Sequence, residues 1–125
     1  MFYNVKKLHQ ILKISKLDNF LFLSFMILIN SFIELHRMWK AISVEVWEDD
    51  EIVGGLYGLD LGDIFCGESM FSKSSNASKV ALYYLNQELK KNNYRFIDCQ
   101  VPSEHLKSLG GEIIKRENFI NLLNK

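Results

Sequence analysis

The stretch SVEVWEDDEIVGGLYG, residues 43–58, indicates how this chain folds. From Ile42 to Trp47 apolar and polar residues alternate, and a period of two is typical of a strand with one face buried. Acidic residues 48–51 follow as a polar turn, and residues 52–57 have the pattern of a returning strand, interrupted by the glycine pair at 54–55. The stretch therefore predicts an antiparallel hairpin.

The residues that follow extend the hairpin into a mixed fold. A third strand is predicted at about residues 63–67, which completes an antiparallel meander. Residues 77–91 carry apolar side chains at helical spacing, and a strand is expected over residues 95–101, just before Pro102. A short helix at 103–109 and a terminal helix at 118–124 complete the chain. This order predicts an α+β fold, a mostly antiparallel sheet flanked by helices.

The N-terminal part has a different character. Residues 2–16 show a loose helical stripe, and residues 20–38 are expected to form a longer helix. That helix contains the uncharged run Phe20–Ile33, FLFLSFMILINSFI, which is shorter than the roughly 18 apolar residues of a membrane span. We therefore favour a helix buried in the protein core, while a membrane-associated segment is the alternative.

Composition excludes some classes of protein. The chain has 125 residues, which suit one domain, and its 48% apolar content is that of a globular protein. Fifteen basic residues balance fifteen acidic ones, which argues against a protein that depends on broad contacts with nucleic-acid phosphates. Cys66 and Cys99 are too few and too far apart for a disulfide framework or a zinc site, so we interpret them as reduced thiols of a cytoplasmic protein.

Three polar residues are candidates for chemistry. Glu68 follows a glycine inside the apolar stretch FCGESMF, 65–71, and a carboxylate in such surroundings needs a cationic partner or a proton. Asp98 and Gln100, two apart in the expected strand, would share one face. A purely structural interpretation stays open: Asp98 would accept backbone amides from the next loop, and Glu68 would pair with a nearby lysine, Lys73 or Lys79.

Six motifs, taken together, resemble one known family. They are SVEVW (43–47), VGGLYG (53–58), FCGESMFS (65–72), NASK (76–79), IDCQ (97–100) and SLGG (108–111). In this order and spacing they are similar to the bacterial leucyl/phenylalanyl-tRNA–protein transferases, over about residues 31–125. The resemblance implies a GNAT-like (acetyltransferase-like) fold, the same fold that the order of elements suggests by analogy.

The resemblance also implies an activity. Such enzymes move leucine or phenylalanine from charged tRNA to the α-amino group of proteins with N-terminal arginine or lysine, which marks those proteins for degradation. No metal or nucleotide cofactor is expected beyond the aminoacyl-tRNA donor. By resemblance, Glu68 helps to hold the acceptor, and Asp98 and Gln100 serve the step that forms the peptide bond. The positions that match the apolar pocket for the donor side chain are Leu56, Phe65, Leu85, Leu89 and Ile97.

The sequence departs from the family pattern at its N-terminal end. Residues 1–30 do not resemble the usual N-terminal domain, so we expect an atypical helical segment at 1–30 ahead of an aminoacyltransferase domain at 31–125. Ile42 replaces a histidine, and Trp39 stands where glycine is common. Two alternatives stay open. The chain could be a shortened, inactive relative that only binds basic protein N-termini. It could also be an acyl-CoA-dependent acetyltransferase, but the glycine-rich loop that binds pyrophosphate in that class is missing from the sequence.

Overall fold

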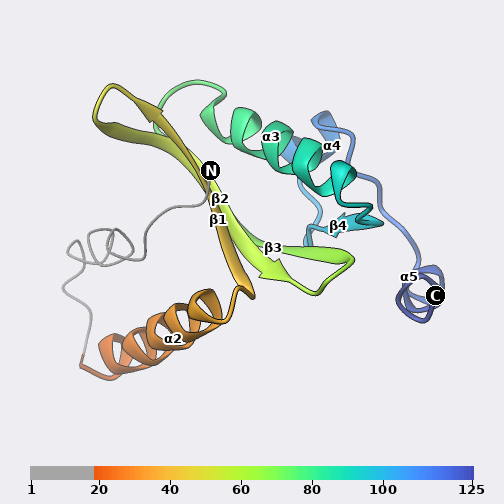
Figure 1. Ribbon diagram of the computed structural model, residues 1–125, viewed down its shortest axis with the longest axis horizontal. Helices are drawn as coiled ribbons and strands as arrows, with labels where there is room; N and C mark the ends of the chain where they lie inside the picture. The colour runs from red at the N-terminus through yellow and green to blue at the C-terminus, as the bar shows by residue number, and fades with distance from the viewer. Residues whose placement is uncertain (1–18) are drawn as a thin grey trace.

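The computed structural model describes the backbone of residues 19–125 and the side chains from residue 27 onward; the helical stripe expected at residues 2–16 lies outside this part. The described chain forms four helices and four strands in alternating groups (Figure 1). In chain order they are α2 (Asn19–Arg37), β1 (Ala41–Glu48), β2 (Glu51–Asp60), β3 (Ile64–Ser72), α3 (Ala77–Lys91), β4 (Phe96–Asp98), α4 (Glu104–Ser108) and α5 (Arg116–Leu123).

The strands form one sheet in the order β1-β2-β3-β4. The first three are antiparallel neighbours, which confirms the predicted meander, and β4 joins β3 in parallel after the chain has passed through α3. Two predicted boundaries are wrong. The third strand continues to Ser72 instead of ending at residue 67, and the fourth covers only Phe96–Asp98, so Gln100 lies outside it.

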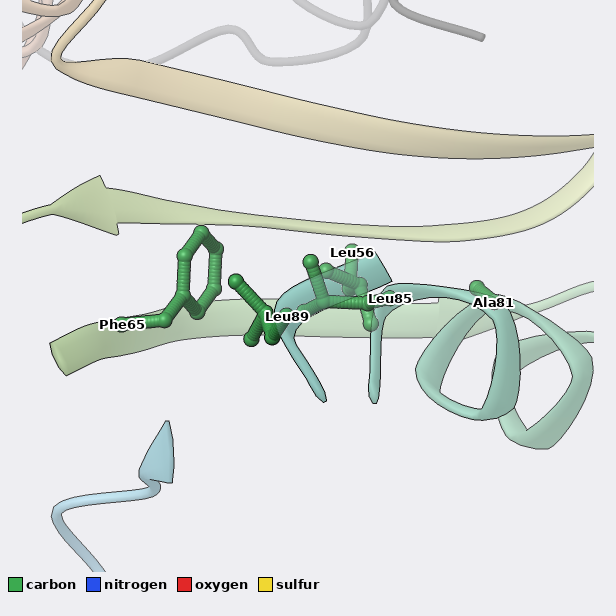
Figure 2. Close-up of a cluster of buried hydrophobic side chains, with 5 residues drawn as sticks. All are labelled: Leu56, Phe65, Ala81, Leu85 and Leu89. Atoms are coloured by element: carbon green, nitrogen blue, oxygen red, sulfur yellow. The ribbon is translucent and has the colours of Figure 1, made fainter. Parts of the chain in front are cut away.

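Helix α3 covers one face of the sheet and makes the core with it. The buried cluster consists of Leu56 and Phe65 from the sheet and Ala81, Leu85 and Leu89 from α3, shown together in Figure 2. The α3 residues recur at spacings of four, so they form the apolar stripe expected of a surface helix. The core thus lies between β2, β3 and α3.

The glycine pair at 54–55 does not interrupt β2, and Gly54 serves the packing of α3. A Cβ placed on Gly54 would lie 2.4 Å from the Cβ of Ala77, so the absence of a side chain lets the start of α3 approach the strand. Strand β2 runs unbroken through both glycines.

Helix α2 lies on the other side of the sheet from α3 (Figure 1). It contacts β1, and the ring of Phe32 meets the ring of Tyr57 edge to face, with centroids 5.3 Å apart. In its described half Ile29 is buried, while Ile27 and Leu28 are more than half exposed, so α2 is amphipathic there and not a fully buried core helix. In the described part of the chain, no helix combines the length and apolar character needed to cross a membrane.

The C-terminal helix α5 is attached at the outer end of the sheet. Arg95 makes an ion pair with Asp63 at 2.7 Å and donates a hydrogen bond to the carbonyl of Leu122. The ring of Phe119 packs against that of Phe96, with centroids 6.0 Å apart. These contacts join the strand β4 to the end of the chain.

Candidate functional site

The candidate site lies where β3 and β4 separate. The two strands pair in parallel only over Ile64–Phe96, Phe65–Ile97 and Cys66–Asp98. Beyond Cys66, β3 continues to Ser72, and no described strand occupies its free edge. Because parallel strands that diverge leave backbone and side chains accessible between them, this opening can accommodate a ligand.

Glu68 stands at a bulge in β3. Gly58 pairs with Gly67 and Tyr57 pairs with Ser69, so Glu68 is an extra residue that has no partner in β2. A β-bulge redirects the side chain of the extra residue, and bulges are frequent beside active sites. The Glu68 side chain is exposed at the opening. Because β3 continues to Ser72, Glu68 lies within the strand, whereas the strand predicted at 63–67 placed it just beyond the end.

Gln100 connects the other two candidate residues. Its side-chain Nε2 donates to Glu68 Oε1 at 3.0 Å and to the carbonyl of Gly67 at 3.1 Å, while its backbone N–H donates to Asp98 Oδ1 at 2.8 Å. Asp98, Gln100 and Glu68 therefore form one hydrogen-bonded chain across the opening. The structural interpretation is confirmed for Asp98, which accepts a loop amide, and it is wrong for Glu68, which lies within ion-pair distance of no described lysine or arginine.

The backbone at Gln100 is strained. Its φ of 61° lies in the left-handed region, and the N–H of Val101 donates to the carbonyl of Cys99 at 2.7 Å. An i to i+2 hydrogen bond around a residue of positive φ is the arrangement of a γ-turn of the rare, strained type. Such strain costs on the order of 1–3 kcal/mol and persists where surrounding contacts hold it, frequently at functional sites. This turn, and not a strand, aims the Gln100 amide at Glu68.

The two carboxylates give the site a negative potential. Burial raises the pKa of the Cys66 thiol, and the charges of Asp98 and Glu68 raise it further. Burial and then Asp98 raise the pKa of Cys99, and burial and then Glu68 raise that of Tyr57. Both thiols are free and stay protonated, which disfavours them as nucleophiles. The same field favours a bound cation.

An apolar cavity of about 150 Å³ opens beside this chain of polar groups. A cavity of about that size, lined by leucine, isoleucine and phenylalanine, accommodates a benzene ring. Of the predicted site residues, Leu56, Phe65, Glu68, Leu85 and Ile97 line it. Leu89 lies in the core cluster instead, and Asp98 and Gln100 lie beside the cavity, in contact with its lining.

Sequence reasoning missed more than half of the cavity wall. The further lining residues are Tyr57, Gly67, Ser69, Met70, Leu82, Cys99 and Leu106. Leu82 precedes Leu85 by three positions on α3, so helical spacing could have indicated it. Met70 reaches the cavity because the bulge at Glu68 shifts the alternation of β3, and Leu106 comes from α4, where no periodic signal exists.

No group of three or more His, Cys, Asp or Glu side chains placed to hold a metal ion occurs among the described residues.

The fold and the site together define a class of protein. The chain superposes on an aminoglycoside acetyltransferase from an uncultured soil metagenomic sample, solved with sisomicin, with a TM-score of 0.56 and 9% identity, covering 89% of this chain and 80% of that one. At this identity the likeness shows the fold alone, which is GNAT-like, as expected. More specifically, residues 26–124 match the family model of the leucyl/phenylalanyl-tRNA protein transferases, and the chain belongs to that family.

Individual relatives support the same assignment. The leucyl/phenylalanyl-tRNA–protein transferase of Flavobacterium johnsoniae is 57% identical over 96 residues, which are 77% of this chain and 45% of the relative. That of Pseudoalteromonas atlantica is 52% identical over 98 residues, 78% of this chain and 42% of the relative. The chain thus spans a little under half the length of the curated relatives it matches.

Proposed function

We propose that this chain transfers leucine or phenylalanine from the charged tRNA to the α-amino group of a protein whose N-terminal residue is arginine or lysine. The product carries a new N-terminal residue that marks it for degradation. The observation that supports this most directly is the hydrogen-bonded series Asp98–Gln100–Glu68, which lies at the mouth of an apolar cavity. The aminoacyl-tRNA is the donor, and the proposed reaction uses no resident metal or cofactor.

The cavity suits the donor side chain. Its wall is formed by aliphatic and aromatic groups, including Leu56, Leu85 and Ile97, which favour an apolar side chain and offer no partner to a polar one. A hole that accommodates a benzene ring has room for phenylalanine or leucine. The aminoacyl ester would then lie at the mouth, where the polar residues stand.

The carboxylate of Glu68 is placed to bind a cationic acceptor. The carboxylate is exposed and accepts a hydrogen bond from the neutral amide of Gln100, and no described lysine or arginine pairs with it. A cationic N-terminal residue of the acceptor supplies the missing opposite charge. We therefore infer that the partner of Glu68 is the substrate.

The side chain of Gln100 is placed to orient the attacking amine of the acceptor. Both hydrogens of its Nε2 are directed to acceptors, Gly67 O and Glu68 Oε1, which sets the orientation of the amide. Its Oε1 receives no hydrogen bond from the described residues and is free to accept an N–H of the acceptor amine. That contact would aim the amine lone pair at the ester carbonyl, and Asp98, bonded to the Gln100 backbone, would hold the turn in place.

The reaction balances without further reagents. The neutral amine nitrogen attacks the ester carbonyl, a C–N bond forms, and the C–O bond to the tRNA 3′ end breaks. The proton lost by the amine leaves with the departing ribose oxygen, and the carboxylates stabilise the positive charge that develops on nitrogen. Because the ester is already activated, positioning supplies much of the rate.

The test is transfer of labelled leucine and phenylalanine from charged tRNA to a protein with N-terminal arginine. The complete chain is compared with Glu68→Gln and Asp98→Asn, which keep shape and remove charge, and with Glu51→Gln, an exposed carboxylate at the start of β2, as the control. We expect transfer by the chain and by the control, and a loss of about a hundredfold or more in both site variants. A folded chain that binds the acceptor but transfers nothing would contradict the proposal and indicate a binding-only relative.

A further inference from the structure

Tyr57 lines the cavity together with Glu68. It follows Leu56 in β2, and successive side chains of a strand point to opposite faces of a sheet. Leu56 accordingly packs in the core under α3, whereas the ring of Tyr57 contacts Phe32 of α2 on the other side. The ring of Tyr57 therefore lies on the α2 face of the sheet, opposite the face on which Leu56 packs under α3.

The ring of Tyr57 is held in place. Phe32 meets it edge to face, with an angle of 86° between the ring planes. Aromatic pairs in this arrangement are favourable because the positive edge of one ring faces the negative face of the other. Tyr57 keeps 37% of its surface exposed and is among the residues that line the cavity, so a fixed aromatic residue remains accessible there.

Tyr57 also lies next to the carboxylate at the bulge. Its partner across the sheet is Ser69, the neighbour of Glu68, and both Tyr57 and Glu68 line the same cavity. After burial, the charge of Glu68 is the second cause that raises the pKa of the Tyr57 phenol, so the ring stands within the field of that carboxylate. An aromatic ring beside an unpaired carboxylate is a combination that binds cations.

We propose that Tyr57 is a further acceptor-binding residue, whose ring forms with Glu68 a two-sided site for the cationic N-terminal residue of the acceptor. The inference rests on the proposed function and deepens it, because it names a further specificity residue of the acceptor site. Glu68 supplies the charge, and the ring supplies a face for a guanidinium or ammonium group. Phe32 acts on the substrate only through Tyr57 and is a positioning residue.

The experiment measures binding and transfer separately. Binding of a short peptide with N-terminal arginine, and of the same peptide with N-terminal alanine, is followed by calorimetry with the complete chain. The variants are Tyr57→Leu, which removes the ring, and Tyr57→Phe, which keeps it. Tyr83→Leu is the matched control, because Tyr83 is 60% exposed and stands edge to face with Tyr84 at 5.6 Å on α3, away from the cavity. Thermal unfolding verifies that each variant is folded.

We expect Tyr57→Leu to weaken binding of the arginine peptide about fivefold to tenfold, while Tyr57→Phe stays within about twofold of the unchanged chain. In the transfer assay the same loss should raise KM for the acceptor and leave KM for the aminoacyl-tRNA and kcat nearly unchanged. Tyr83→Leu should change neither.

Other results would overturn the inference. The ring does not hold the cation if Tyr57→Leu and Tyr83→Leu bind the arginine peptide equally well. The same conclusion follows if Tyr57→Phe loses as much affinity as Tyr57→Leu, or if the unchanged chain does not bind the peptide. A higher KM for the donor would place Tyr57 in the donor pocket instead. The proposed function fails by a different observation, namely no transfer by the unchanged chain, whether or not Tyr57 affects peptide binding.

Discussion

Gly58 and Gly67 face each other across β2 and β3, yet a methyl group would have different consequences at the two positions. A Cβ on Gly58 would lie 2.2 Å from the carbonyl oxygen of Cys66 and 2.6 Å from the ring of Phe65. A Cβ on Gly67 would meet only the carbonyl of Asp98, at an ordinary 3.6 Å. Gly58 is thus required by packing, whereas Gly67 leaves space at the site.

We expect Gly58→Ala to lower the free energy of unfolding by about 3 kcal/mol, because backbone and a fully buried ring must move. Gly67→Ala should change it by less than about 1 kcal/mol. Urea unfolding of both variants measures this difference. In the transfer assay, Gly67→Ala should still lose about tenfold or more, since the new methyl stands in the cavity wall beside the reacting groups. Equal stability of the two variants would contradict the packing argument.

At the same scale, the sequence indicates which acids matter but not how they are arranged. Glu68 and Asp98 are conspicuous because each interrupts an apolar strand pattern. The position of Gln100 could not be predicted in this way, because Gln100 lies in a γ-turn of positive φ and its side-chain amide meets Gly67 and Glu68, more than thirty residues away in the sequence. Alternation assigns a side chain to a face only while the chain remains a strand.

At the scale of elements, helix α3 contributes residues both to the core and to the cavity wall, and its sequence pattern does not distinguish the two groups. Leu85 and Leu89 are both buried in the core cluster, and both match the family's donor pocket by resemblance. Leu85 lines the cavity, whereas Leu89 does not. One turn of helix therefore separates a residue of the site from a residue of the core alone.

Truncation of the two leucines should reveal this separation. Leu85→Ala and Leu89→Ala are each expected to cost about 2–4 kcal/mol of stability, measured by urea unfolding, because both leave a hole in the core. Only Leu85→Ala should change donor selectivity, raising the ratio of phenylalanine to leucine transfer about tenfold by widening the cavity. A similar change of selectivity in Leu89→Ala would show that the cavity extends further along α3.

At the scale of the whole molecule, a hydrogen bond between distant segments joins the residues that follow α3 to the end of β2. The hydroxyl of Tyr94 donates to Asp60 Oδ1 at 2.6 Å, across 34 positions of sequence. Burial and this hydrogen bond raise the pKa of Tyr94 from 10.0 to about 12. The neutral phenol is therefore the form that the folded state prefers.

This preference has a predictable effect on alkaline stability. The unfolded chain loses the Tyr94 proton near pH 10 and the folded chain only near pH 12, so the folded state binds more protons in between. The contribution of Tyr94 is complete below pH 10 and is lost as the pH rises toward about 12. Tyr94→Phe should be less stable than the unchanged chain at neutral pH, and the difference in thermal midpoint should shrink over that interval. A constant difference would show that the phenol does not titrate as expected.

The sequence by itself determined the parts of this protein that arise from local periodicity. Alternation at residues 42–47, the acidic turn and the helical stripe from Ala77 indicate the meander and its covering helix, because burial of one face requires those spacings. The tertiary structure decided the rest. The bulge at Glu68, the contact of the Gln100 amide with Glu68 and the arrival of Tyr57 and Leu106 at the cavity depend on contacts between distant segments, which no local pattern encodes.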